Sequence, residues 1–369
     1  MNGIDSIEVR TASARYDAVV GRGALRHAAA LMADRGVRPS ACAIVCDAAV
    51  EHGAAKSVDD SLRAAGTRSV RITMAATEDS KSLATLGDLC ERMLADGIDR
   101  DGAVIAVGGG VVGDVAGFAA ATYMRGIPCV QVPTTLLAMV DAAVGGKTAV
   151  NLVRADGSIA KNIVGSIAQP RLVICDPEAL ATLPARALRS GLAECVKHAV
   201  IADPAMLAWI TARIDPILAH DPDTLGALVA RNIRIKAGVV GEDEREDGRR
   251  AVLNLGHTFA HAIESLAHGE VTHGEAVAIG TLAACRLALG PAADDAERAV
   301  RSALQAIGLP TALPAAMPVE RLMDAMASDK KRRGGVLRLV VPHGLADVRV
   351  EAGLPAARVA EAWRSVGAG

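Results

Sequence analysis

The sequence predicts an α/β domain followed by a mostly α-helical domain. Short apolar runs alternate with helical patterns in the first half of the chain, which is typical of a layered α/β fold. Long segments of helical period dominate the second half. A chain of 369 residues is also too long for one ordinary hydrophobic core. We therefore expect two domains, an α/β domain over 1–180 and a mostly helical domain over 181–369.

Six short apolar runs are the candidate strands of the first domain, and helical patterns such as Leu83–Asp96 lie between several of them. The most apolar stretch, Gly102–Tyr123, contains six glycines and Asp114, which makes it a poor membrane helix. We interpret it as a buried strand, a glycine turn and a helix of a largely parallel sheet. The candidate strands are Asp17–Val20, Ala43–Cys46, Val70–Thr73, Val104–Val107, Val130–Val132 and Leu172–Cys175.

After Thr182-Leu183-Pro184 the apolar residues follow a helical period. Ligands commonly bind where two domains meet, so we expect the active site in the cleft between the domains. The predicted helical segments are Leu188–Ala202, Thr224–Val240, Asn254–Ala267 and Gly274–Leu289, with two late strands at Leu337–Val341 and Asp347–Val350.

Composition and charge exclude several classes of protein. Hydrophobic residues make up 51% of the chain, charged residues 22%, and the net charge is −2, so the basic surface that nucleic acids require is missing. Two Phe, two Tyr and two Trp give no stacking platform for single strands. The seven scattered cysteines contain no CxxC pair, and the N-terminus MNGIDSIEVR does not resemble a signal peptide. We expect a cytoplasmic protein with reduced thiols.

A glycine-rich segment, Gly108-Gly109-Gly110-Val111-Val112-Gly113-Asp114, directly follows the predicted strand Val104–Val107. Glycines let backbone N–H groups approach a phosphate, and the N-terminus of a following helix favours an anion. The segment is not a strict GxGxxG, and a tight structural turn would use the same residues. Its position at a strand-to-helix junction favours nucleotide binding.

Two histidines and a glutamate indicate a metal site in the second domain. His257 and His261 are four residues apart and share one face of a helix, and His273 opens the next helical segment. Glu194 lies in a different predicted helix. Two imidazoles and one carboxylate from different helices suit zinc with open positions for substrate oxygens. The spacing lacks the interior Glu of the zinc-protease motif, which disfavours that function.

A third group consists of basic and amide residues, several of which have small, apolar neighbours. A charge in such a setting usually meets a specific anion, so the expected ligand is a small phosphorylated or carboxylated molecule. The group comprises Arg125, Lys147, Lys161, Asn162, Lys197, Lys236, Arg250, Asn254 and the pair Lys330-Lys331.

Together these segments resemble the 3-dehydroquinate synthase family of sugar-phosphate cyclases, over a stretch from about residue 8 to about residue 350. The resemblance implies an N-terminal NAD-binding α/β domain and a C-terminal, mostly helical domain that binds metal and substrate, usually in a homodimer. The segments that carry it are Gly108–Asp114, Gln131–Leu137 leading to Asp141, Gly145–Thr148, Gly191–Glu194, Leu253–Thr258 and His273–Val277.

Residue roles follow from the resemblance. The divalent metal, normally zinc with cobalt as the alternative, would be bound by Glu194, His257 and His273. NAD would contact Asp47, Glu78, Lys81, Gly109, Gly110, Val111, Asp114, Thr134, Thr135, Asp141, Lys147, Lys161, Thr182 and Leu183. The substrate would contact Lys147, Asn162, Lys197, Lys236, Arg250, Asn254, His261, one of Lys330 or Lys331, and Arg125 of the partner subunit.

The implied reaction converts 3-deoxy-D-arabino-heptulosonate 7-phosphate to 3-dehydroquinate and phosphate. In this family NAD transiently oxidises a carbon whose hydroxyl the metal binds, and phosphate leaves by β-elimination. NADH then returns its hydride, and ring opening with an intramolecular aldol reaction gives the carbocycle. His261 and Lys197 are the expected residues for proton transfer or carbonyl polarisation.

Two segments depart from the family pattern. Residues 151–162 form a longer loop than is usual before Lys161-Asn162, and the additional residues are expected to form a surface excursion. Ala187 stands where the family commonly has Glu, which puts one cofactor contact in doubt.

Three alternative functions share part of the pattern. Another cyclase, making an amino-dehydroquinate, a valiolone or a deoxy-inosose, would have the same fold, metal and NAD. However, Lys197, Lys236, Arg250 and Asn254 follow the dehydroquinate synthase pattern. A metal-dependent polyol or alcohol dehydrogenase would not need so many anion-binding residues. An inactive relative acting as a scaffold would be expected to lose its metal ligands and lysines first.

Overall fold

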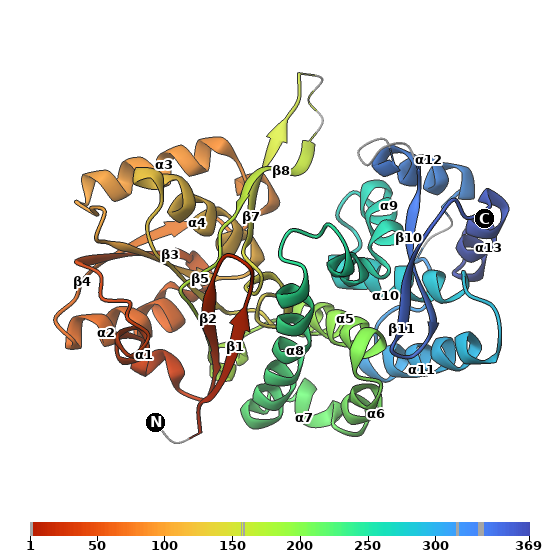
Figure 1. The fold of residues 1–369 in the computed structure, drawn as a ribbon, viewed down its shortest axis with the longest axis horizontal. Coiled ribbons are helices and arrows are strands. Elements are labelled where there is room, and N and C mark those ends of the chain that lie inside the picture. The colour runs from red at the N-terminus through yellow and green to blue at the C-terminus, as the bar shows by residue number, and fades with distance from the viewer. Residues whose placement is uncertain (1–2, 156, 158, 315–316, 331–335) are drawn as a thin grey trace. The chain divides into compact units, whose positions relative to one another are not determined.

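A computed structural model describes residues 3–155, 157, 159–314, 317–330 and 336–369 (Figure 1). Contacts divide the chain into two units, one formed by 1–184 with 220–244 and the other by 185–219 with 245–369. This division differs from a single boundary near residue 180. The reason is that helix α8 (Pro222–Glu242) packs on strand β1 (Asp5–Arg10) and on the helical turn η6 (Ala138–Ala142) of the first unit.

A seven-stranded sheet with the order β1-β2-β9-β6-β5-β3-β4 forms the centre of the first unit. All six predicted strands are present, and they run parallel to one another. The additional strand β1 pairs antiparallel with β2 at the edge of the sheet. Its residues alternate between apolar and polar, and the sequence did not predict it as a strand. The six are β2 (Arg15–Val20), β3 (Ala41–Asp47), β4 (Arg68–Met74), β5 (Ala103–Gly108), β6 (Cys129–Pro133) and β9 (Leu172–Cys175).

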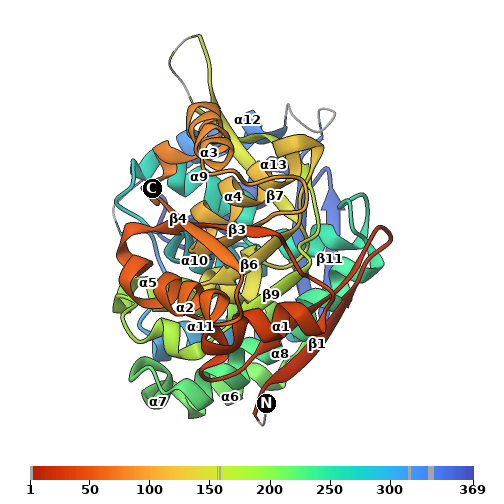
Figure 2. The same cartoon turned by 90° about the vertical axis from the view of Figure 1, so that its left-hand side faces the viewer.

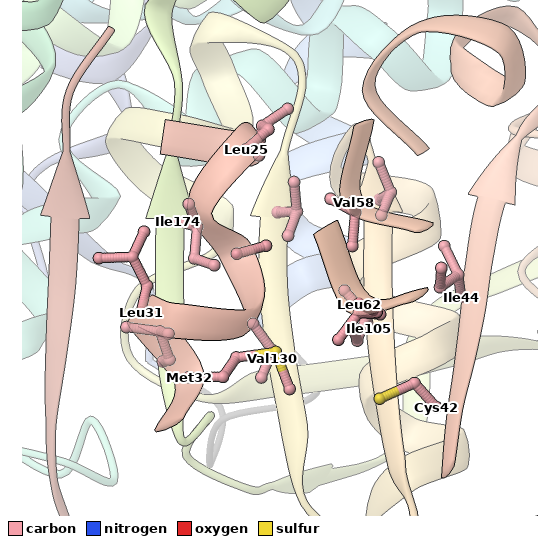
Figure 3. Packing of buried hydrophobic residues seen from close by; sticks show 14 of the residues in the cluster. Leu25, Leu31, Met32, Cys42, Ile44, Val58, Leu62, Ile105, Val130 and Ile174 are labelled. Carbon is pink, nitrogen blue, oxygen red and sulfur yellow. The ribbon is translucent and has the colours of Figure 1, made fainter. Parts of the chain in front are cut away.

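Helices cover both faces of this sheet because successive residues of each buried strand point to opposite sides. Cys42, Ile44 and Ile105 pack under α1 (Ala28–Asp34) and α2 (Lys56–Ala64), as Figure 3 shows. The neighbouring positions of the same strands pack under α3 (Leu83–Ala95) and α4 (Gly110–Thr122). In Figure 2 the sheet is seen from its β4 edge, with α3 and α2 on opposite sides of that strand.

The longer loop expected before Lys161-Asn162 is part of a β-hairpin. Strands β7 (Lys147–Val153) and β8 (Ile159–Ile167) pair antiparallel and form a sheet of their own, which packs on α4. The end of this hairpin extends away from the rest of the first unit (Figure 1). The expected surface excursion is confirmed, since residues 152–155, 157 and 159 are exposed, and most of its residues belong to the two strands of the hairpin.

The second unit consists mainly of helices, together with a two-stranded sheet of β10 (Arg338–Gly344) and β11 (Asp347–Ala352). The predicted helix over Asn254–Ala267 begins later, because Gly256 adopts a left-handed conformation at φ 77°. The helices are α5 (Ala185–Ala202), α6 (Ala205–Ala212), α7 (Ile214–Leu218), α9 (His257–Ala267), α10 (His273–Cys285), α11 (Pro291–Ile307), α12 (Val319–Lys330) and α13 (Ala356–Ser365).

The stretch Gly102–Tyr123 forms β5 and α4, as expected from its glycines. Among the residues that the structure describes, no helix combines the length and apolar character needed to cross a membrane.

Candidate functional site

Three side chains from three helices converge in the second unit. Glu194 on α5 is fully buried, and its Oε1 lies 3.7 Å from His257 Nε2 on α9 and 3.4 Å from His273 Nε2 on α10. One ligand atom from each of the three residues lies within 4.8 Å of the others. The predicted trio is therefore assembled, although its members are up to 79 positions apart in sequence.

The donor set of the trio fits a divalent metal. Two imidazole nitrogens and one carboxylate oxygen are ligands that zinc takes in catalytic sites, where a fourth position stays open for substrate or water. A fully buried carboxylate such as Glu194 also requires a compensating positive charge. Lys197, which is only 1% exposed, forms an ion pair with Glu194.

The two histidines of the trio differ in protonation. Burial lowers the pKa of His257, and the charge of Lys197 lowers it further, to about 3, so its imidazole is neutral and able to ligate. Burial acts in the same direction on His273, but hydrogen bonds and attraction from Glu194 and Glu264 outweigh it and raise the pKa to about 10. Because metal ligation requires a neutral imidazole, a cation would displace this proton.

A further carboxylate contacts the trio and was not predicted. Glu264 Oε1 lies 3.4 Å from His273 Nδ1, the ring nitrogen on the opposite side from Glu194. Such an outer carboxylate typically fixes the ring orientation of a metal-bound histidine. His257, His261 and Glu264 follow one another at helical spacing on α9, which was the signal that could have identified Glu264. The His261 ring lies edge-on to His257, with 5.8 Å between ring centroids.

Local sequence determines where the two histidine-bearing helices begin. Thr272 and Glu275 form a capping box, so α10 starts at His273. The start of α10 then approaches the α5 backbone closely: the Gly274 N–H donates to Ser190 Oγ at 3.0 Å, and a Cβ at Gly274 would overlap the Ser190 backbone. Ser190 lies one turn before Glu194. The absence of a side chain at Gly274 therefore lets His273 reach Glu194.

Replacing Gly274 with Ala is expected to weaken metal binding about 10–100-fold, which is typical for residues that support metal ligands. The added Cβ must displace α10 from the backbone of α5, because backbone atoms cannot rotate away. Titration of the metal against a competing chelator measures the change. Gly87→Ala on α3 is the matched control, since a Cβ there meets nothing within 4 Å, and unchanged metal affinity in Gly274→Ala would contradict the argument.

In the first unit, predicted nucleotide-binding residues follow the carboxyl ends of parallel strands. The strand order reverses direction between β3 and β5, and ligands of open α/β sheets bind at such a switch point. Asp47 ends β3, and the glycine segment joins β5 to the N-terminus of α4, where Gly110 and Val111 begin the helix. Thr134 follows β6, and its N–H donates to the Gly108 carbonyl at 2.9 Å. Thr135 packs against Gly109.

A second group in the first unit connects predicted cofactor and substrate residues. The buried Lys81 ammonium donates to Asp114 Oδ2 and to Asn162 Oδ1, each at 2.6 Å. Glu78 is joined to this group through Asn151. Lys236 on α8, only 5% exposed, donates to the carboxylate and the carbonyl of Asp141. Five predicted residues therefore form direct hydrogen bonds with one another: Lys81 with Asp114 and Asn162, and Lys236 with Asp141.

The remaining predicted residues lie at separate positions in the two units. Lys147 and Lys161 are exposed on the β7–β8 hairpin, and Arg125 is exposed in a turn with φ 69°. Thr182 and Leu183 precede α5, and Ala187 lies in its first turns. Arg250 is 2% exposed, and Asn254 donates to Glu246. Lys330 ends the backbone of α12, and Lys331 lies outside the described residues.

The fold and these clusters together define the class of the protein: it has a dehydroquinate synthase-like fold, with a parallel-sheet α/β unit and a mostly helical unit that carries a metal-ligand trio. The family model of the 3-dehydroquinate synthase N-terminal region matches residues 71–190, and that of the C-terminal region matches residues 191–332. A 3-dehydroquinate synthase of Caulobacter vibrioides is 44% identical over 357 residues, which cover 94% of this chain and 95% of the relative. The chain belongs to the 3-dehydroquinate synthase family.

Solved structures of two other cyclases resemble the whole chain. The 2-epi-5-epi-valiolone synthase of Streptomyces hygroscopicus subsp. jinggangensis, with NAD+ and Zn2+ bound, has a TM-score of 0.83 at 28% identity, covering 95% of this chain and 96% of that one. A 2-deoxy-scyllo-inosose synthase complexed with carbaglucose-6-phosphate, NAD+ and Co2+ has a TM-score of 0.84 at 25% identity, covering 98% and 100%.

Proposed function

We propose that this chain converts 3-deoxy-D-arabino-heptulosonate 7-phosphate to 3-dehydroquinate and inorganic phosphate. This is a carbon–oxygen lyase reaction of the shikimate pathway, which leads to chorismate and the aromatic amino acids. Family membership supports the proposal. The structural observation that carries it is the trio of Glu194, His257 and His273, because a metal held there would lower the pKa of the substrate hydroxyl that is oxidised.

The proposed cofactors are NAD and a divalent cation, Zn2+ or alternatively Co2+. The donor set of the trio supports the cation, and the two similar cyclases solved with NAD+ and Zn2+ or Co2+ support both. When bound, the cation polarises a substrate oxygen and the dinucleotide accepts and returns a hydride. The residues proposed to hold NAD are Asp47, Glu78, Lys81, Gly109, Gly110, Val111, Asp114, Thr134, Thr135, Asp141, Lys147, Lys161, Thr182 and Leu183.

The chain's own contribution to the reaction is mainly capture and orientation of a flexible dianionic substrate. Lys236 and Arg250 are buried cations, and such cations form strong charge-assisted hydrogen bonds with a carboxylate or a phosphate. The exposed His261 imidazole beside the trio is the proposed group that holds or passes a proton at its ring nitrogen. The other residues proposed to meet substrate are Lys147, Asn162, Lys197, Asn254 and Lys330.

We also propose that two copies of the chain form a homodimer in which Arg125 reaches the phosphate in the partner's site. Met124 and Arg125 both have positive φ, at 50° and 69°, a conformation that costs energy and is common at functional sites. The exposed face of β8 carries Ile159, Ile163 and Ile167, an apolar surface suited to burial against another copy. All seven cysteines lie outside disulfide bonds, which supports a reducing, cytoplasmic location.

Phosphate release from 3-deoxy-D-arabino-heptulosonate 7-phosphate, with only trace NAD present, tests the proposed function. Many turnovers per NAD are expected, because the hydride is returned in each cycle. Sedoheptulose 7-phosphate serves as the competing substrate, and turnover of that compound alone would refute the proposed substrate in favour of a valiolone-type reaction. Accumulation of NADH in proportion to product would instead identify a dehydrogenase.

A further inference from the structure

A buried amide, Asn151, connects three segments of the first unit. Its backbone N–H donates to the Lys81 carbonyl at 2.7 Å, and its side-chain oxygen accepts from the Asn162 backbone N–H at 2.8 Å. Its Nδ2 donates to the Glu78 carboxylate at 2.7 Å and to the Glu78 carbonyl at 3.3 Å. Only 6% of Asn151 is exposed. Each of the three partners is a predicted site residue, whereas Asn151 itself is not.

Two irregularities of the β7–β8 hairpin meet at this amide. The pairing register shifts between Val150 and Leu152, so Asn151 lies at a bulge, and bulges commonly redirect a side chain next to a functional site. Opposite it, Asn162 has a left-handed backbone with φ 54°, a conformation that Asn tolerates better than most residues but that a local restraint must still favour over the ordinary regions. The hydrogen bond from the Asn162 N–H to Asn151 Oδ1 provides this restraint.

The conformation of Asn162 determines what its side chain offers to a ligand. Its Oδ1 already accepts from the Lys81 ammonium, which also donates to Asp114. Within the part of the chain that the structure describes, no acceptor meets Asn162 Nδ2, so two N–H donors are available to a substrate oxygen. Asn162 is exposed, so a ligand can reach these donors.

The amide at position 151 meets both requirements from two separate atoms, because its oxygen accepts from Asn162 while its nitrogen donates to Glu78. An aspartate would keep the acceptor but would place its carboxylate against that of Glu78. We propose that Asn151 is a positioning residue that sets the backbone of Asn162 and the carboxylate of Glu78 for substrate and NAD binding. This inference rests on the proposed function of those two residues.

The test compares Asn151→Asp, Glu78→Gln and the double variant Asn151→Asp/Glu78→Gln. In the double variant the new Gln amide donates to the new Asp carboxylate, so the lost bond is restored with its direction reversed. Asn151→Asp is expected to raise both the KM for 3-deoxy-D-arabino-heptulosonate 7-phosphate and the Kd for NAD about 10–100-fold, as losses of supporting residues typically do. Because Glu78 is itself proposed to contact NAD, the double variant is compared with Glu78→Gln, and its Kd for NAD should lie within about twofold of that single variant. If the double variant instead lost as much further NAD affinity as Asn151→Asp loses in the wild-type background, the proposal would be overturned.

A readout that needs no activity separates this inference from the proposed function. Hydrogen exchange at the Asn162 amide of the ligand-free chain is expected to accelerate about tenfold in Asn151→Ala, because its acceptor is removed. Unchanged exchange there would overturn the proposal even if catalysis were lost. Failure of the wild-type chain to release phosphate, with exchange and NAD binding behaving as expected, would instead refute the proposed reaction.

Thr148→Val is the matched control for destabilisation of the hairpin. It removes a partly buried hydrogen bond of the same strand, from Thr148 Oγ1 to the Ser166 carbonyl at 2.9 Å, without touching Glu78 or Asn162. Its urea midpoint should fall while its Kd for NAD stays within about twofold of wild type, since a single neutral hydrogen bond contributes little. If Asn151→Asp behaves in the same way, losing stability but neither NAD affinity nor KM, the residue is structural and the proposal is wrong.

Discussion

Alanine at Glu194 or at His257 is expected to abolish metal binding and catalysis together. The site has three candidate metal ligands within 4.8 Å of one another, and removing one leaves two donors that cannot hold a divalent cation against water. In Glu194→Ala the ammonium of Lys197 also loses its carboxylate partner in a fully buried position, which disfavours a cation further. Metal content of the purified variants and phosphate release measure the two effects.

His343→Ala is the matched control for this experiment. His343 Nε2 contacts Glu351 Oε1 at 2.5 Å, so it is also a histidine of the second unit beside a carboxylate, but it lies in the β10–β11 sheet and not in the trio. Metal content should stay at the wild-type value there. Normal metal content in Glu194→Ala or His257→Ala would disprove the assignment of the site, whatever happened to activity.

Arg250→Ala is expected to weaken capture of the anionic substrate far more than binding of NAD. The arginine is 2% exposed, and loss of one partner from a buried charge pair costs about 2–5 kcal/mol, which corresponds to a change of roughly 30-fold or more in KM. Steady-state kinetics give KM, and titration gives the Kd for NAD. Arg349→Ala, which removes an exposed arginine paired with Asp347, controls for loss of charge alone. Equal losses in KM and in NAD affinity would contradict the proposed role of Arg250.

Much of the fold was predictable because buried parallel strands appear in sequence as continuous apolar runs. The run Val104–Val107 is an example: both faces of β5 are covered, so every residue from Ala103 to Gly108 is buried. Strand β1 was missed because an antiparallel edge strand has one solvated face and only Ile7 and Val9 on the other. The hairpin was missed because glycine and polar residues in 151–162 are typical of loops as well as of short exposed strands.

The trio was predictable for a different reason. Histidine and glutamate are the residue types that metals select, and His257 and His273 each occur where a helix begins. The importance of Glu264 and Asn151 lies in which neighbours they contact after folding. Helical spacing from His257 would have identified Glu264. No local pattern would have identified Asn151, because its hydrogen bonds connect residues that are distant in sequence.

The insertion of residues 220–244 into the first unit has a consequence for how the protein is made. During synthesis the sheet is completed by residue 175, but the α8 side chains that cover β1 and η6 emerge about 50 residues later, after part of the second unit has left the ribosome. Neither unit is therefore a contiguous module that could be expressed alone by cutting the chain once. A gene split near residue 184 would produce a first fragment without Lys236 and with an uncovered apolar edge, prone to aggregate.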